Sequence, residues 1–202
     1  MQRRHLLLSA GLLSALAIGG CGSTYVVTAD VSTFGKWPEG RAAGSYAFDR
    51  LPSQQQDEAR QDVHEKAARA ALEKAGFTPA ADAKSADVLV TIGLRVSPQD
   101  RAPWDDPLWW RWQGNYGYWR YGPGWRGYGP MWTEPRYDRS VALLLRDRVS
   151  GEPLYEARAS NDGMTQGDSR LSGALFSAAL AEFPKVEPKP HSVSVQVSRD
   201  AN

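Results

Sequence analysis

The chain has 202 residues, of which 24 are lysine or arginine and 23 are aspartate or glutamate, so its formal net charge is +1. This balance argues against a globally basic nucleic-acid-binding protein, and a single cysteine excludes an internal disulfide framework. The length is that of one domain, or of one domain and a tail, and it can bury a core without disulfides or metal.

The first 20 residues have the layout of an export signal. Arg3 and Arg4 form a short basic start, an apolar run covers residues 6–18, and the small residues Gly19 and Gly20 follow. The apolar run is shorter than the roughly 20 residues that a transmembrane helix needs. Residues 1–20 are therefore expected to be removed, which leaves a nearly neutral mature chain. The arginine pair leaves open whether export follows the general or the twin-arginine route.

The only cysteine, Cys21, stands directly after this signal. The run Ile18-Gly19-Gly20-Cys21 resembles the lipobox of bacterial lipoproteins, in which the cysteine thiol receives a diacylglycerol and the signal is cut just before it. The resemblance implies attachment to a membrane through acyl chains on Cys21 and a location in the cell envelope. Gly22 in place of an aspartate implies the outer membrane, with the protein facing the periplasm. The alternative is an ordinary secreted protein with a free thiol.

Two strands and a helix are expected between Cys21 and residue 76. Apolar residues alternate with polar ones over residues 25–32, which is typical of a half-buried strand, and a second short strand is expected over 45–48. Ser53 and Gln56 fit a capping box for a helix over residues 54–75. The buried stripe expected for this helix consists of Val63, Ala67, Ala68, Ala71, Leu72 and Ala75.

Three further strands and a second helix are expected after residue 86. Alternating apolar residues predict strands over 87–96, 141–146 and 154–160, and a turn at Val149-Ser150-Gly151-Glu152 joins the last two as a hairpin. The second helix is expected to run from a cap at Asp168 or Ser169 to a stop at Pro184. Residues 192–197 either add an edge strand or stay mobile. The predicted fold is α+β, an antiparallel sheet of four to five strands with two helices packed on one face.

The predicted domain carries one long insertion. The chain divides into a signal peptide over residues 1–20, a lipidated tether with the first strand over 21–44, an α+β domain over 45–184 and a C-terminal tail over 185–202. A long Gly/aromatic-rich loop over 97–137 is inserted between two strands of the domain. Within it, the stretch from Trp104 to Trp132, here called the aromatic segment, holds seven of the eight tryptophans, four tyrosines and six glycines.

The aromatic segment has one packing interpretation and several binding interpretations. Its rings either fold back on the sheet and complete the core, or they bind a partner. Rings interleaved with arginines suit sugar faces and phosphate or carboxylate groups, which favours peptidoglycan, another glycan or an envelope protein. Tryptophan and tyrosine also suit a membrane interface, whereas export argues against a nucleic acid, although the composition resembles single-strand binding platforms. The candidate binding residues are Trp109, Trp110, Arg111, Trp112, Tyr118, Trp119, Arg120, Tyr121 and Trp125.

No catalytic or metal-binding pattern stands out. The chain has no G-x-S-x-G, H-E-x-x-H or P-loop motif, and His64 and His191 are isolated along the sequence. Asp105 and Asp106 lie beside prolines, so a turn explains them better than a metal site. We therefore expect no catalytic residue, metal or cofactor, and a non-enzymatic binding function. The alternatives are an enzyme acting on an envelope polymer and a structural lipoprotein whose aromatic segment only packs on the sheet.

The order of several short motifs resembles a known family. The motifs are Ser45-Tyr46-Ala47-Phe48 before the first helix, Ala86-Asp87-Val88-Leu89-Val90 after it, Leu144-Leu145-Arg146-Asp147 leading into the hairpin, and Phe183-Pro184 after the second helix. From about residue 26 to 184 the chain resembles the bacterial lipoproteins grouped as domain of unknown function 4136 (DUF4136). The resemblance implies an antiparallel sheet with helices packed against it, and it brings no established activity.

Overall fold

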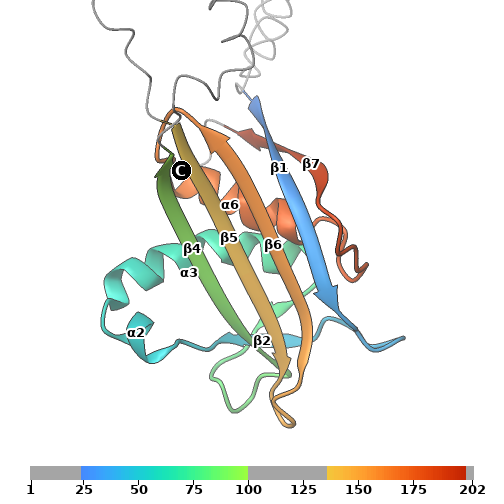
Figure 1. The fold of residues 1–202 in the computed structure, drawn as a ribbon. Helices are drawn as coiled ribbons and strands as arrows, with labels where there is room; N and C mark the ends of the chain where they lie inside the picture. Colours follow the sequence, from blue (N-terminus) through green and yellow to red (C-terminus); the bar gives the residue numbers. More distant parts are fainter. Residues whose placement is uncertain (1–23, 100–135, 199–202) are drawn as a thin grey trace, which may run out of the picture.

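The computed structural model describes residues 24–99 and 136–198, which form one seven-stranded sheet and three helices (Figure 1). The strands are β1 (Thr24–Gly35), β2 (Ser45–Phe48), β3 (Thr78–Pro79), β4 (Val88–Gln99), β5 (Arg136–Asp147), β6 (Pro153–Gly163) and β7 (His191–Ser198). The helices are α2 (Pro52–Gln55), α3 (Glu58–Lys74) and α6 (Ser169–Ala179). The strand order across the sheet is β3-β2-β4-β5-β6-β1-β7, so the α+β class is confirmed.

The hydrophobic core lies on one face of this sheet. In β5, Val141, Leu143 and Leu145 are buried while Ala142 between them is exposed, because successive side chains of a strand point to opposite faces. The same alternation buries residues 27, 29, 31 and 33 of β1, residues 88, 90 and 92 of β4, and residues 155, 157 and 159 of β6. Helices α3 and α6 pack against each other and cover this face (Figure 1). In the described part of the chain, the opposite face carries no helix.

The sheet is larger and less uniform than the four to five antiparallel strands expected. Strands β4, β5, β6, β1 and β7 pair antiparallel in that order, but β2 pairs in parallel with both β4 and β3. β3 was not predicted, because it has only two residues and one of them is Pro79. β7 pairs with β1 along its full length, so the tail that the sequence left open provides an edge strand. β4 continues through Gln99, and β5 already begins at Arg136.

The first expected helix is divided in two. Residues 52–55 form α2, and α3 begins only after Asp57, whose carboxylate accepts a backbone N–H of the first turn. The capping box predicted for Ser53 and Gln56 is wrong, because Gln54 Oε1 accepts the backbone N–H of Leu51 at 2.9 Å instead. The predicted bond from a glutamine side chain to the backbone N–H three residues earlier is present, but it lies two residues earlier in the chain than predicted.

Helix α3 also turns a different face to the core than its apolar residues predict. Positions 68, 71 and 72 are buried as expected, but Val63 is 53% exposed. Glu65 lies on the buried face instead, and both of its carboxylate oxygens accept hydrogen bonds from Arg50, at 2.7 and 2.9 Å. A charged residue can occupy this face because its charge is paired and hydrogen-bonded.

The turn signals of the β5–β6 hairpin are confirmed. Gly151 adopts a φ of 74°, which favours glycine. Asp147 Oδ1 accepts hydrogen bonds from the backbone N–H groups of Val149 and Ser150 at 3.0 and 2.9 Å. Its Oδ2 accepts a hydrogen bond from Arg41 Nη1 at 2.9 Å. These bonds, the Ser150 N–H above all, lower the pKa of Asp147 to about 2.

Helix α6 begins as the sequence predicts and ends earlier. Asp168 is its N-cap, and its Oδ1 accepts the backbone N–H of Leu171 at 2.9 Å. The helix ends at Ala179, and a turn leads from there to Pro184. Its buried residues belong to one apolar face, as the spacing of leucines and alanines indicates.

Candidate functional site

The two ends of the sheet connect to different parts of the chain. One end, here called the Thr24 end, contains the start of β1 at Thr24, the end of β4 at Gln99, the start of β5 at Arg136 and the end of β6 at Gly163. The strand registers bring these termini together, because β4 is antiparallel to β5, β5 to β6 and β6 to β1. Figure 1 shows them at the top of the molecule. The opposite end, where β1 stops, is the Gly35 end.

The residues singled out from the sequence lie outside the described part of the chain. They are Cys21, Trp109, Trp110, Arg111, Trp112, Tyr118, Trp119, Arg120, Tyr121 and Trp125. The structure describes the points where their segments join the domain. Cys21 precedes Thr24 by three positions, a span of at most about 10 Å, and residues 100–135 connect Gln99 to Arg136. The expected anchor and the aromatic segment are therefore attached to the same end of the sheet.

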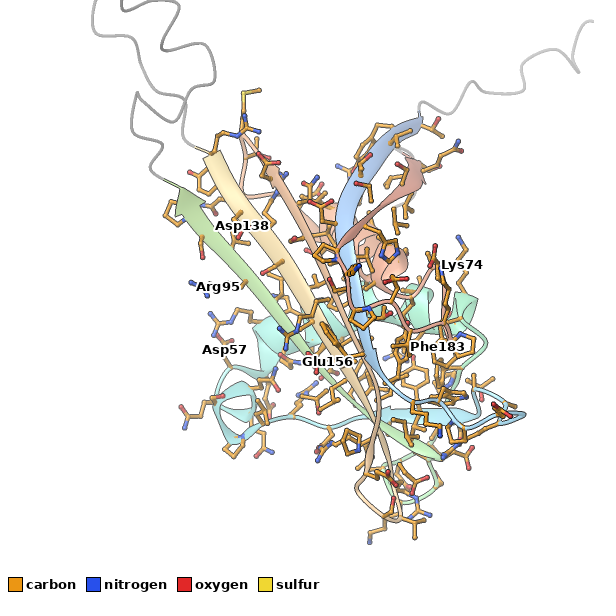
Figure 2. The ribbon with its side chains drawn as sticks, turned by 45° about the vertical axis from the view of Figure 1, so that its right-hand side comes forward. Asp57, Lys74, Arg95, Asp138, Glu156 and Phe183 are labelled. Carbon is orange, nitrogen blue, oxygen red and sulfur yellow. The ribbon has the colours of Figure 1, made fainter. Side chains whose placement is uncertain are left out.

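The described side chains at the Thr24 end are partly apolar and balanced in charge. Val26, Val96 and Met164 are 60, 38 and 63% exposed. Arg136 of β5 forms an ion pair with Asp162 of β6. Figure 2 labels two further charged residues toward this end, Arg95 on β4 and Asp138 on β5. Such a surface has no strong preference for either sign of charge.

One arginine at this end is buried instead of exposed. Arg139, on the core-facing side of β5, is 8% exposed. Its Nε and Nη2 donate to the backbone carbonyl and side-chain oxygen of Asn161, and its Nη1 donates to the carbonyl oxygen of Thr165 at 3.1 Å. Burial lowers the pKa of Arg139 from its usual value, although a guanidinium stays protonated in proteins. Sequence reasoning missed this residue, although it continues the inward alternation of Val141 by two positions.

The Gly35 end is closed by aromatic packing. Trp37, the one tryptophan outside the aromatic segment, is 8% exposed, and its Nε1 donates to the carbonyl oxygen of Arg41 at 2.9 Å. Its ring centroid lies 4.8 Å from that of Phe183 and 5.8 Å from that of Phe77, and Tyr155 packs on Phe183 at 5.0 Å. Figure 2 labels Phe183 in this part of the molecule. Among the described residues, the aromatic rings at this end are packed into the core.

Among the described residues, the histidines and carboxylates do not gather into a site. His64 is on α3, where burial, followed by the charge of Arg60, lowers its pKa, and His191 begins β7 with its Nε2 3.5 Å from Glu182. In the described ranges, no three histidine, cysteine, aspartate or glutamate residues are placed to hold a metal ion. Within the same ranges, no helix is long and apolar enough to cross a membrane.

Comparisons with known proteins identify a family but no activity. A PDZ domain protein from Parabacteroides distasonis matches at 13% identity with a TM-score of 0.47, over 96% of this chain and 43% of that protein, so this chain spans less than half of its length. The PelC dodecamer from Paraburkholderia phytofirmans matches at 14% identity with a TM-score of 0.39, over 79% of this chain and 96% of that one. A search of curated proteins found no match. The family described as "Domain of unknown function (DUF4136)" matches residues 30–185, most of the chain. The chain therefore belongs to the DUF4136 family.

Proposed function

We propose that this protein is a non-enzymatic, lipid-anchored component of the cell envelope that binds the membrane surface beside its anchor through the aromatic segment. One observation carries the proposal. The strand that follows Cys21 starts at the same end of the sheet as the two strand termini that hold the aromatic segment, Gln99 and Arg136. An acyl anchor on Cys21 would hold that end of the domain, and no other, against the bilayer.

The composition of the segment suits this position. Tryptophan and tyrosine are enriched at membrane interfaces because one part of each ring system is apolar and another part carries a hydrogen-bonding group. The segment includes three arginines, and its acidic residues are only Asp105 and Asp106 near its start. Arginine forms bidentate hydrogen bonds with phosphate groups. The exposed Val26, Val96 and Met164 extend the apolar character to the described end of the sheet.

A second membrane contact would also orient the domain. Acyl chains supply about 0.8 kcal/mol per buried CH₂, so they attach the protein firmly, but a chain on a short tether does not by itself fix a rotation. Interfacial aromatic rings beside the anchor would hold the sheet end down and direct the Gly35 end away from the bilayer. The strands would then run along the membrane normal, and the exposed sheet face would point sideways, accessible to an envelope partner.

The anchor is tested by metabolic labelling. Radiolabelled palmitate is expected to enter the wild-type protein and not the Cys21→Ser variant. Equal labelling of the two would remove the lipoprotein proposal.

The aromatic contact is tested by fluorescence quenching of the lipidated protein in vesicles. Brominated phospholipids quench tryptophans that touch the bilayer, so we expect strong quenching of the wild type. A variant with alanine at Trp109, Trp110, Trp112 and Trp119 should lose most of the quenchable signal. Trp37→Phe is the matched control, because Trp37 is buried at the opposite end and its removal should leave the quenched component unchanged.

The outcomes separate the alternatives. Quenching that is absent in the anchored wild type would contradict membrane contact. Capture by isolated peptidoglycan or by an envelope protein, lost in the four-alanine variant, would then assign the segment to that partner. A large drop in melting temperature of the four-alanine variant without quenching or capture would support the structural alternative, in which the rings only complete the fold.

A further inference from the structure

An open pocket of about 400 Å³, here called the cavity, lies beside the start of α6, and the residues 165–168 that line it are exposed. Its wall contains Arg139 from β5 and Tyr25 from β1, and the connection from β6 to α6 completes it with Thr165, Gln166, Gly167, Asp168 and Leu171. All of these residues belong to the described part of the chain. The cavity is at the Thr24 end, because Tyr25 is the second residue of β1 and Arg139 the fourth of β5.

Among the described residues, the guanidinium of Arg139 forms no ion pair with a carboxylate, and the charges of Asp162 and Asp138 act on it only through space. The three hydrogen bonds of Arg139 all go to neutral acceptors, namely the carbonyl oxygens of Asn161 and Thr165 and the amide oxygen of Asn161. A guanidinium has five N–H groups, so two of them have no acceptor among the described residues. Because buried charges in proteins are usually paired, the arrangement favours an external anion.

The other polar groups of the wall can donate to the same anion. The hydroxyl groups of Tyr25 and Thr165 and the side-chain amide of Gln166 have no hydrogen-bond partner in the described ranges. Asp168 is the only acid in the wall, and its two oxygens are already occupied by the Leu171 N–H and by Arg170 Nε, at 2.9 and 3.0 Å. Its negative charge is therefore balanced within its own ion pair.

Two glycines make room for the guanidinium and for the loop beside it. A Cβ added at Gly163 would lie 2.4 Å from Arg139 Nη2 and 3.0 Å from its Nη1. At Gly167, where φ is +81°, an added Cβ would lie 2.4 Å from a methyl group of Leu171 and 3.5 Å from Arg139 Cδ. Side chains at either position would displace the arginine or close the cavity, so the local sequence is compatible with an open, arginine-lined pocket.

We propose that this cavity binds a phosphate group, with Arg139 as the charged ligand and Tyr25, Thr165 and Gln166 as neutral donors. A phosphate group offers several strong acceptor oxygens, which matches one planar fork and several separate donors better than a single-atom anion does. The group can belong to a phospholipid head group, because the cavity is at the sheet end nearest Cys21, or to free phosphate. The proposal does not depend on membrane contact by the aromatic segment.

The test is calorimetric titration of the full-length protein in a nonionic detergent and a phosphate-free buffer. The probes are sodium phosphate, short-chain phosphatidylglycerol, and sodium chloride at the same ionic strength. Arg139→Gln and Gln166→Glu are expected to weaken binding of a phosphate probe by about tenfold or more, the effect of losing a charge-assisted hydrogen bond or adding a repulsive charge. Gln166 is exposed, so its replacement tests the site even if Arg139→Gln unfolds the protein.

One control variant completes the experiment. Arg158→Gln removes an exposed arginine on the opposite sheet face, where it pairs with Glu156, and it should bind like the wild type. Binding of the lipid alone assigns the source to a head group, and comparable binding of both phosphate probes shows that the phosphate suffices. Absence of binding beyond that of chloride, or binding unchanged in Gln166→Glu, would overturn the proposal.

Discussion

Replacing Glu65 by alanine should destabilise the fold through one ion pair. Glu65 lies on the buried face of α3, where its two oxygens accept hydrogen bonds from Arg50 Nε and Nη2 at 2.7 and 2.9 Å. Arg50 stands between β2 and α2, so the pair ties the connection at the sheet edge to the helix that covers the core. The bonds to Glu65, followed by those to Asp62, raise the pKa of Arg50 still further above its usual value.

The expected loss can be estimated from the burial of the two partners. Removing one member of a fully buried pair costs about 3–5 kcal/mol. The Arg50 side chain is 25% exposed and keeps Asp62 as a partner at 2.5 Å, so part of that cost is avoided. We therefore expect Glu65→Ala to lower the free energy of unfolding by about 2–3 kcal/mol, and the melting temperature by about 5–10 °C for a protein of this size.

The measurement is urea unfolding followed by circular dichroism, with a double-mutant cycle of Arg50→Ala and Glu65→Ala. Asp62→Asn is the matched control, since it removes a carboxylate from the same arginine at a position that is 66% exposed; it should cost less than about 1 kcal/mol. The reasoning is refuted if Glu65→Ala costs no more than Asp62→Asn, or if the cycle shows no coupling between Arg50 and Glu65.

Three further predictions concern other parts of the fold. Gly35→Ala should lower the free energy of unfolding by about 3 kcal/mol or more, because the added Cβ would lie 2.6 Å from a backbone carbonyl oxygen. Gly40 also has a positive φ but open space around it, so Gly40→Ala should lower that free energy by only about 1 kcal/mol. Thermal melts of the two variants compare these effects. The pKa of Asp147 is about 2 in the native state against 3.8 ordinarily, so its ionised form stabilises the fold above about pH 4, and this contribution disappears as the pH falls toward 2. Asp147→Asn should therefore flatten the dependence of melting temperature on pH below 4. Leu72→Ala, at 0% exposure, should cost about 2–5 kcal/mol in urea unfolding, while Val63→Ala, at 53%, should cost under about 0.5 kcal/mol.

The elements that could be predicted from sequence are those whose signals are local. The strands around Val27, Val90 and Leu143 follow from an alternation that holds only when one face is buried. The glycine of the β5–β6 turn and the aspartate that caps α6 act on backbone atoms within three residues of themselves. These features depend only on neighbouring residues, so the structure forms them where the sequence predicts them.

The failures come from contacts between distant segments. Hydrophobicity places Val63 in the core and Glu65 outside it, and the reverse holds because Arg50, 15 positions before Glu65, supplies a charged partner. The parallel insertion of β2 between β3 and β4 likewise depends on pairings that no local pattern contains. The burial of Arg139 could have been predicted, because Arg139 precedes Val141 by two positions and therefore points to the same, buried face of the strand.

For the candidate site, the sequence shows the composition of the aromatic segment but not its position relative to Cys21. The clustering of seven tryptophans within 29 residues is visible in the sequence alone. Its relation to Cys21 depends on a chain of pairings, in which β1 lies against β6, β6 against β5, and β5 against β4. Residues more than 70 positions apart are thereby attached to one sheet end.

The division between the two sheet ends limits what each class of mutation can do. At the Gly35 end, Trp37, Phe77 and Phe183 are packed into the core, so replacing them changes stability first and any binding only through loss of the fold. At the Thr24 end, Val26 and the cavity-lining residues 165–168 are exposed, so they contribute little to packing. Substitutions there can alter binding while the domain remains folded. Variants at this end are therefore the ones that can separate a binding function from a purely structural one.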